Sequence, residues 1–160
     1  MQKRWRALAC SDRLHEVVKS WEKTPYMALQ SKKQGGVDCI RFVCSVADEL
    51  YGYSRGPMVS LPPDQAMHDR EGALAAMRAI CRRYEPLIDA TDDEYLEPGD
   101  ILVVGPSGGG PGHAMIAGGR QGHIWECLAS GVTLSGMPLI GSAVELFRIY
   151  RVMDKHKWSS

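Results

Sequence analysis

The first third of the chain alternates apolar and polar positions with a helical period. Between residues 11 and 22 the apolar residues recur at i, i+3, i+4 and i+7: Leu14, Val17, Val18 and Trp21. Ser11 and Asp12 stand just before this stripe, where a side-chain oxygen can cap the first amides of a helix. The pattern predicts an amphipathic helix over 11–22, which ends at Thr24-Pro25 because proline disfavours a helical conformation in the residue before it.

A second helix is predicted over about 38–51, after a loop through Gly35 and Gly36. Its inward face carries five apolar residues: Ile40, Val43, Val46, Ala47 and Leu50. A third helical stretch is predicted over roughly 64–84, after a proline-containing turn. We interpret the segment at about 53–95 as a helical insertion in a small fold.

From Leu96 onward the pattern changes to short apolar runs bounded by glycine and proline. Four strands are predicted: 101–104, 113–117, 122–128 and 146–152. The middle two form a hairpin across the turn at 118–121. Helices first and strands second indicate an α+β fold, with N-terminal helices packed on a small antiparallel sheet. With 160 residues, the chain is predicted to form one domain over 1–160.

Charge and cysteine content argue against several functions. Lys plus Arg and Asp plus Glu each number 19, so the net charge of zero disfavours a nucleic acid or an anionic membrane as partner. The five cysteines show no CxxC and no zinc-ligand spacing, which disfavours a disulfide framework and a structural metal. The sequence shows no membrane span and no secretory signal, so we expect a protein made in the cytoplasm.

Cys39 is the strongest candidate for chemistry, because it follows Asp38 at the predicted start of a helix. The unsatisfied amides and the positive dipole end of a helix favour a thiolate, which is the reactive form of cysteine. His113 opens the predicted strand 113–117, and a cysteine followed by a strand-borne histidine is the papain-like order. Cys39 is therefore the predicted nucleophile and His113 its predicted general base.

A third polar group is expected to orient the His113 ring. A hairpin turn centred near residues 119 to 120 puts His113 opposite about residue 126, so Glu126 is the preferred candidate. His123 is the alternative, although it has the opposite parity. A zinc site made of His113, His123 and Cys127 is disfavoured, because successive residues of a strand point to opposite faces.

At these residues the chain resembles the NlpC-type cell-wall cysteine peptidases of the papain superfamily. Four segments carry the likeness, in the family's order: Thr24-Pro25-Tyr26, Gly36-Val37-Asp38-Cys39 with Arg41-Phe42-Val43, Leu96-Glu97-Pro98-Gly99-Asp100-Ile101-Leu102, and His113-Ala114-Met115-Ile116. The family's third catalytic residue usually lies about 12 residues after the histidine, where this chain has Trp125. Ile40 and Arg41 also replace small residues that the family commonly shows after the cysteine.

The resemblance implies a papain-like NlpC-type fold and hydrolysis of an amide bond in peptidoglycan stem peptides, beside a D-glutamyl or related residue. Cys39 would form an acyl-enzyme and His113 would protonate the departing amine. Tyr26 and the Cys39 amide would stabilise the oxyanion, while Asp38 would position the site by capping and bracing the helix. No metal or organic cofactor is implied.

Two other functions stay open. An amidase or acyl transferase would use the same thiol chemistry on another substrate. A non-catalytic phage tail or assembly module would keep the fold without catalysis. This alternative is supported by Trp125, which stands where the family usually has its third catalytic residue. Since stem peptides lie outside the cytoplasm, we expect delivery on a phage tail or gene-transfer particle, or export by another route.

Overall fold

The computed structural model describes residues 3–52, 70–137, 140–141 and 143–158. Within these ranges the helices are α1 (Asp12–Ser20), α2 (Cys39–Tyr51), α3 (Arg70–Arg83) and the 3₁₀-helix η3 (Lys155–Trp158). The main sheet contains β4 (Leu87–Asp89), β6 (Ile101–Pro106), β7 (His113–Ala117), β8 (Ile124–Leu128), β9 (Gly131–Ser135) and β10 (Val144–Val152). Two short ribbons pair β1 (Arg4–Trp5) with β5 (Tyr95–Leu96), and β2 (Ser31–Lys32) with β3 (Gly36–Val37).

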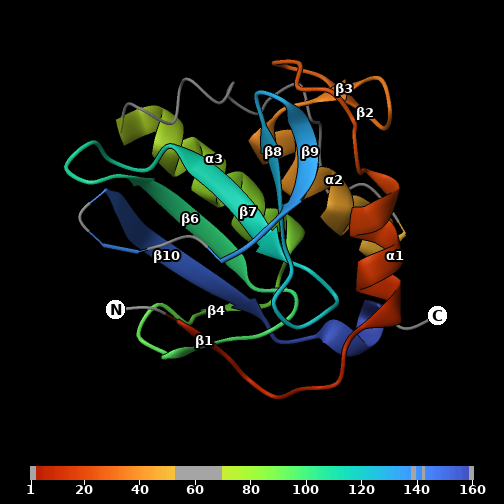
Figure 1. Ribbon diagram of the computed structural model, residues 1–160, viewed down its shortest axis with the longest axis vertical. Coiled ribbons are helices and arrows are strands. Elements are labelled where there is room, and N and C mark those ends of the chain that lie inside the picture. The colour runs from red at the N-terminus through yellow and green to blue at the C-terminus, as the bar shows by residue number, and fades with distance from the viewer. Residues whose placement is uncertain (1–2, 53–69, 138–139, 142, 159–160) are drawn as a thin grey trace.

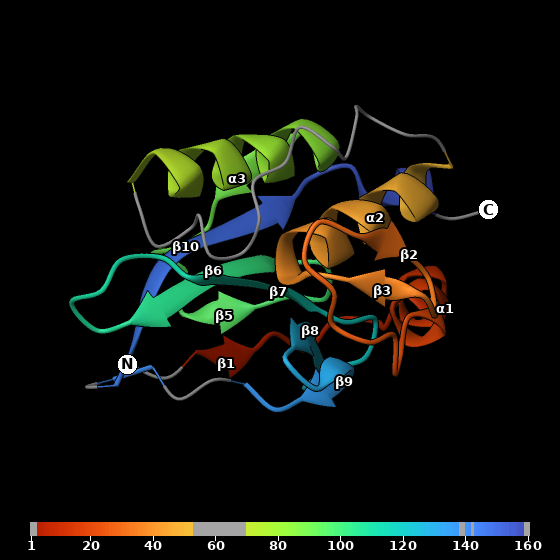
Figure 2. The ribbon, with the colours of Figure 1, turned by 90° about the horizontal axis from the view of Figure 1, so that it is seen from above.

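The main sheet has the order β4-β10-β6-β7-β8-β9, and every neighbouring pair in it is antiparallel. Helices α2 and α3 cover one face of this sheet, and the β1–β5 ribbon lies on the other side (Figures 1 and 2). Helix α1 lies beside α2 at one end of the sheet (Figure 1). The fold is therefore α+β, with helices packed on an antiparallel sheet as the sequence predicts.

The first two helices begin and end where capping chemistry places them. The Ser11 side chain accepts a hydrogen bond from the Leu14 amide and caps α1, and the predicted inward stripe of this helix is buried. In α2 all five predicted inward residues are buried. Gly52 ends α2 in the left-handed conformation, at φ +75°, which glycine adopts without steric cost.

The predicted insertion at 53–95 is only partly helical. Its first part, 53–69, lies outside the described residues, and α3 ends at Arg83. Pro86 prevents the helix from continuing, because proline lacks an amide hydrogen and clashes with the preceding turn. Beyond Pro86 the chain forms β4, which pairs with β10 at the edge of the main sheet, and then β5.

Two buried clusters fill the two sides of the sheet. The helix-side core joins the buried residues of α1, α2 and α3 to eight sheet residues: Ile101, Val103, Ala114, Ile116, Trp125, Cys127, Val132 and Val152. The ribbon-side core consists of Ala90, Leu96, Leu102, Val104, Met115, Ala117, Ile124 and Ile149. Odd and even positions alternate between the two along β6, β7 and β8, as the strand period of two requires.

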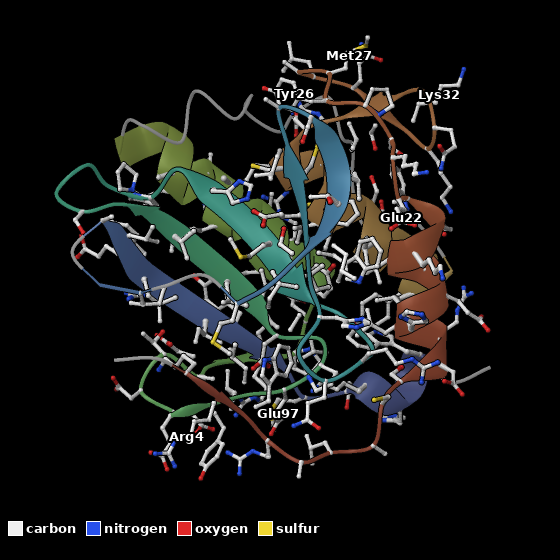
Figure 3. All side chains as sticks on the ribbon, viewed as in Figure 1. Arg4, Glu22, Tyr26, Met27, Lys32 and Glu97 are labelled. Carbon is white, nitrogen blue, oxygen red and sulfur yellow. The ribbon has the colours of Figure 1, made fainter. Side chains whose placement is uncertain are left out.

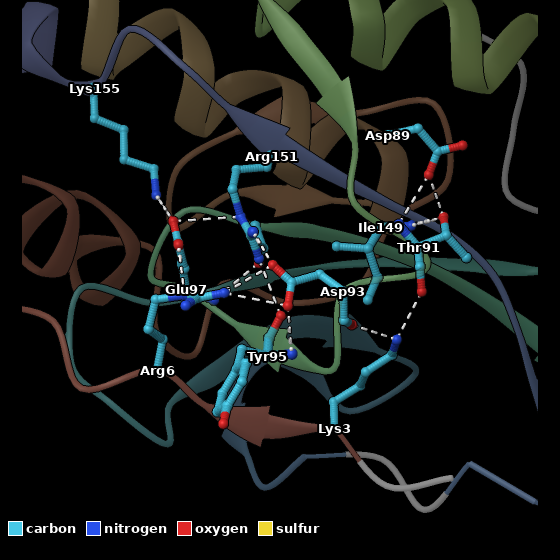
Figure 4. Close-up of polar contacts among 11 residues, drawn as sticks. Lys3, Arg6, Asp89, Thr91, Asp93, Tyr95, Glu97, Ile149, Arg151 and Lys155 are labelled. Carbon is cyan, nitrogen blue, oxygen red and sulfur yellow. Dashed lines mark hydrogen bonds and ion pairs between the residues drawn. The ribbon is translucent and has the colours of Figure 1, made fainter.

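A network of charges ties the N-terminal ribbon to β10 (Figure 4). Arg151 of β10 forms a bidentate pair with the buried Asp100, with donor–acceptor distances of 3.1 and 2.9 Å. It also donates to Asp93 at 2.6 Å, and Arg6 pairs with the same aspartate at 2.9 Å. Glu97 forms ion pairs with Arg6 and Arg151, with nitrogen–oxygen distances of 3.0 and 3.3 Å. These contacts hold the 93–100 turn against the strand that closes the sheet.

The hairpin of β7 and β8 differs in register from the prediction. Ile116 lies opposite Trp125 and Ala117 opposite Ile124, so the same register continued to His113 puts it opposite Leu128. The expectation that His113 lies directly opposite Glu126 is therefore wrong by two residues. The reason is a longer turn, since β8 begins at Ile124 rather than at residue 122. A shift of two positions keeps Glu126 on the face of the sheet that His113 occupies.

The sequence did not predict six short strands: β1, β2, β3, β4, β5 and β9.

Among the described residues, none of the helices has both the length and the apolar character needed to cross a membrane.

Candidate functional site

Asp38 fixes the start of α2 and so places Cys39 in its first turn. Its carboxylate caps the helix by accepting a hydrogen bond from the Arg41 amide at 2.9 Å. The same carboxylate accepts from the Leu29 amide at 3.0 Å, which holds the preceding loop to the helix. Asp38 is fully buried, so it braces the helix from inside and does not face a substrate.

Arg41 completes this brace. Its guanidinium donates to Asp38 Oδ2 at 2.8 Å, and both side chains are buried. A buried ion pair needs good geometry and additional hydrogen bonds to offset desolvation, and Asp38 has them. Arg41 thus has a structural role, and an opposite charge three positions after Asp38 is the sequence signal for it.

Tyr26 lies beside the residues that lead into Cys39. The backbone of residues 25–27 runs next to Val37: the Val37 amide donates to the Pro25 carbonyl, and the Met27 amide donates to the Val37 carbonyl, both at 3.0 Å. The Tyr26 ring packs against the helix-side core, which contains Cys39. Figure 3 shows Tyr26 and Met27 together at the end of the molecule where β8 and β9 meet the β2–β3 ribbon.

The start of β9, at Gly131 and Val132, holds the loop that carries Tyr26 against the sheet. The Val132 amide donates to the Thr24 carbonyl at 2.8 Å, and the Lys23 amide donates to the Val132 carbonyl at 2.9 Å. Gly131 has φ +107°, and a Cβ atom there would lie 2.6 Å from the Thr24 oxygen. Only glycine fits this close approach, so the position of Tyr26 depends on it. Gly131 was not among the predicted site residues.

His113 and Glu126 form a hydrogen-bonded pair, as the sequence predicts. The distance between His113 Nε2 and Glu126 Oε1 is 2.8 Å, and the two side chains are 22% and 12% exposed. Burial opposes ionisation of Glu126, but the hydrogen bond with His113 and the nearby Ser135 side chain outweigh it and lower the pKa of the carboxyl group. The carboxylate is therefore hydrogen-bonded to Nε2 of the imidazole, and Nδ1 is the ring nitrogen that can face another group.

The His113–Glu126 pair and Cys39 lie on opposite faces of the main sheet. By alternation, His113 shares the face of Met115, while the next residue, Ala114, lies in the helix-side core with Cys39. His113 is the first residue of β7 and Cys39 the first residue of α2, and α2 packs on β7. Because of these positions, the Cys39 thiol could meet the His113 ring only around the end of β7, not through the sheet.

Cys39 itself is 1% exposed. Cys127 belongs to the same helix-side core, is buried as predicted, and its thiol donates to the Val37 carbonyl at 3.2 Å. Burial raises the pKa of the Cys44 thiol to about 12 and also raises that of Cys81. Both thiols are therefore protonated at neutral pH, which agrees with the expectation that they are inert.

His123 is not the partner of His113. Its ring lies 6.0 Å from the ring of His15 on α1, measured between centroids. The disfavoured zinc site of His113, His123 and Cys127 does not assemble either, because the three side chains have different partners and faces. Within the described ranges, no three His, Cys, Asp or Glu side chains converge as ligands of a metal ion.

Ser135, like Gly131, was not predicted to belong to the site. It lies on β9, a strand that was not predicted, on the face of the sheet that Glu126 occupies, and its side chain contributes to the lowered pKa of the Glu126 carboxyl group. The β-branched residues Val132 and Thr133 after Gly131 were the available signal for that strand.

No family model matches this chain, and no curated protein is significantly similar to it.

Proposed function

We propose that the protein is a cysteine peptidase that hydrolyses an amide bond in peptidoglycan stem peptides, with an NlpC-like papain fold. The observation that carries the proposal is the His113–Glu126 pair at the start of β7, next to the helix that begins with Cys39. A carboxylate on Nε2 fixes the imidazole tautomer and stabilises the imidazolium, which is what the base in a thiol peptidase requires.

The residues present account for each step of the reaction. The Cys39 thiolate attacks the carbonyl carbon, and the Cys39 amide with the Tyr26 hydroxyl stabilises the oxyanion. The imidazolium of His113 donates its proton to the departing amine as the C–N bond breaks. A water molecule, deprotonated by the same ring, then hydrolyses the thioester and restores the thiol. Asp38 and Arg41 keep the helix start in place throughout.

A non-catalytic assembly module is the second candidate, and the burial of Cys39 favours it. A nucleophile must reach its substrate, and at 1% exposure the Cys39 side chain can do so only if the segments packed around it move apart. An amidase or acyl transferase would share the thiol chemistry and differ in the acceptor of the acyl group. Association with a phage tail or gene-transfer particle stays a prediction.

The pH dependence of Cys39 alkylation by iodoacetamide tests the proposal, with peptide mass mapping to separate the five cysteines. Rapid labelling well below pH 8.5, slowed in His113→Ala, would support a thiolate–imidazolium pair. His156→Ala is the matched control, because this histidine is exposed and remote in sequence from the site. Labelling at the rate of an ordinary thiol in both proteins would instead support the assembly module.

Product analysis then identifies the reaction. Incubation with a synthetic stem peptide that contains a γ-D-glutamyl bond should release a free amine in the wild type and none in Cys39→Ala. Adding an amine acceptor separates hydrolysis from acyl transfer, because a transferase would form a new amide.

A further inference from the structure

Leu29 presents an apolar side chain to solvent from a strained backbone position. The Gln30 amide donates to the Met27 carbonyl at 3.2 Å and closes a turn over residues 27–30. Leu29 is the third residue of this turn and has φ +66°, in the left-handed region that favours glycine or asparagine. Its side chain is 57% exposed, more than any other large apolar side chain that the structure describes.

Neither property stabilises the free protein. A left-handed backbone costs leucine more than it costs glycine, and an exposed side chain gains nothing from burial. Residues held in such conformations cluster at active sites and ligand clamps. Among the described residues, the other two with positive φ that are not glycine are Lys23 and Gln34, whose polar side chains water solvates. Leu29 is therefore a candidate for a role in the ligand-bound state.

The turn that carries Leu29 is fixed beside the start of α2. The Leu29 amide donates to Asp38 Oδ2, and the Met27 amide donates to the Val37 carbonyl, both at 3.0 Å. The turn is thus held at two points to the residues that directly precede Cys39. Met27 is also exposed, and Figure 3 shows it beside Tyr26 at this end of the molecule. Two exposed apolar side chains therefore lie on the loop that carries the proposed oxyanion residue.

The chemistry of these two side chains limits what they bind. The isobutyl group of Leu29 has no hydrogen-bonding atom, and the thioether of Met27 is only a weak acceptor. They therefore suit an aliphatic group and offer no partner to a charged one. Each carbon atom that such a contact removes from water is worth about a four-fold gain in affinity.

We propose that Leu29 is a specificity-determining residue, which contacts an aliphatic side chain of the substrate next to the amide bond that Cys39 attacks. The proposal rests on the proposed function, because it names a group of the stem peptide that the site selects. The preferred peptide has an aliphatic residue attached to the amino group of the D-glutamyl unit. Contact with that residue buries the Leu29 side chain and so offsets the backbone strain in the complex.

The test measures kcat/KM for γ-D-glutamyl peptides that carry glycine, serine or valine at this position. The proteins are the wild type, Leu29→Gly, Leu29→Met and Lys23→Gly. Lys23→Gly is the matched control, because it replaces another exposed left-handed residue, at φ +68°, whose side chain is charged and not apolar. Urea denaturation of the same four proteins is the second readout, which does not depend on activity.

We expect the wild type to prefer the valine peptide about ten-fold over the glycine and serine peptides. In Leu29→Gly this preference should fall below about three-fold, mainly through a higher KM for the valine peptide. Leu29→Met, which stays apolar, and Lys23→Gly should keep the preference. Both glycine variants should have urea midpoints equal to or above that of the wild type, because glycine adopts a left-handed backbone without strain.

The outcomes separate this proposal from the proposed function. A wild type that cleaves none of the peptides would overturn the proposed function, and the role of Leu29 with it. Cleavage without a preference in the wild type, or with the same preference in Leu29→Gly, would overturn the role of Leu29 alone. A urea midpoint below the wild type in Leu29→Gly but not in Lys23→Gly would also overturn it, because the leucine would then serve the fold of the loop.

Discussion

Glu126 Oε1 lies 2.8 Å from His113 Nε2, although the two residues are diagonal and not directly opposite on β7 and β8. The length of the glutamate side chain spans this diagonal, and an aspartate would fall short. The pair joins two strands at the end where α2 begins. The Glu126 carboxylate is a stronger hydrogen-bond acceptor for His113 than a neutral amide oxygen in the same position, because it carries a negative charge.

Glu126→Gln isolates the contribution of that charge. The amide keeps an acceptor for the His113 ring but removes the negative charge that stabilises the imidazolium. We expect alkylation of Cys39 to slow about ten-fold at pH 6, with a smaller effect at pH 9, where an ordinary thiol ionises unaided. Rates measured by mass spectrometry across this range would show the difference. Glu145→Gln is the control, since Glu145 is exposed on β10, and equal rates in wild type and Glu126→Gln would contradict the prediction.

The helices were predictable because their pattern is local. The apolar stripes of α1 and α2, the Ser11 cap and the Asp38 cap all follow from spacings within one or two turns. Glu126 was also predictable, because the face of a strand residue depends only on parity. The error of two residues in the hairpin register left that parity unchanged.

The remaining features depend on contacts between distant segments, which a single sequence does not encode locally. β9 has only its first residues buried, so it lacks the apolar alternation of a typical strand, and Ser135 was missed with it. Arg151 and Asp100 are 51 residues apart and meet only when β10 closes the sheet. The burial of Cys39 could not be predicted either, because it depends on how α2 packs on β7 and β8.

Gly131→Ala should displace the loop that carries Tyr26. The new Cβ would lie 2.6 Å from the Thr24 carbonyl oxygen, and alanine at φ +107° is strained. We expect a loss of about 1–3 kcal/mol in the free energy of unfolding, measured by urea denaturation. Gly136→Ala is the control, because no atom lies within 4 Å of a Cβ there. If the two variants are equally stable, the loop does not depend on Gly131.

Arg151→Met should leave Asp100 buried without its cation. Asp100 is fully buried, and burial raises its pKa even beside Arg151. Removing one partner of a buried pair typically costs about 3–5 kcal/mol. Because a raised carboxyl pKa means that the folded state binds more protons than the unfolded state, the loss should be larger at pH 7 than at pH 4.

Two further variants test whether the loss of the buried Arg151–Asp100 pair is the cause of this destabilisation. Arg148→Met removes an exposed arginine from the same strand, whose 3.6 Å ion pair with Asp89 is open to solvent, and should cost less than about 1 kcal/mol. Asp100→Asn combined with Arg151→Met removes both charges and should recover part of the loss. Urea denaturation that gives equal losses for Arg148→Met and Arg151→Met would rule out the buried pair as the cause.

His15 should make the stability of the protein depend on pH near neutrality. Burial, together with electrostatic repulsion from Arg120, His123 and Lys19, lowers the pKa of His15, while Asp12 partly opposes them. The ring contacts His123, and the turn that carries Arg120 is anchored to α1 by the Ser11 amide, which donates to the Gly119 carbonyl at 2.9 Å. Protonation of His15 would thus place another positive charge where α1 meets the β7–β8 hairpin.

The sign follows from proton binding. Since the pKa of His15 is lower in the folded state than its ordinary value of about 6.5, the unfolded state binds the proton first as the pH falls. Stability should therefore decrease as the pH drops through about 6.5 toward the folded-state pKa. His15→Gln removes this contribution, so its urea midpoint should fall less between pH 7.5 and 5.5 than that of the wild type. His156→Gln, at an exposed site, should keep the wild-type dependence, and parallel curves for all three proteins would contradict the role of His15.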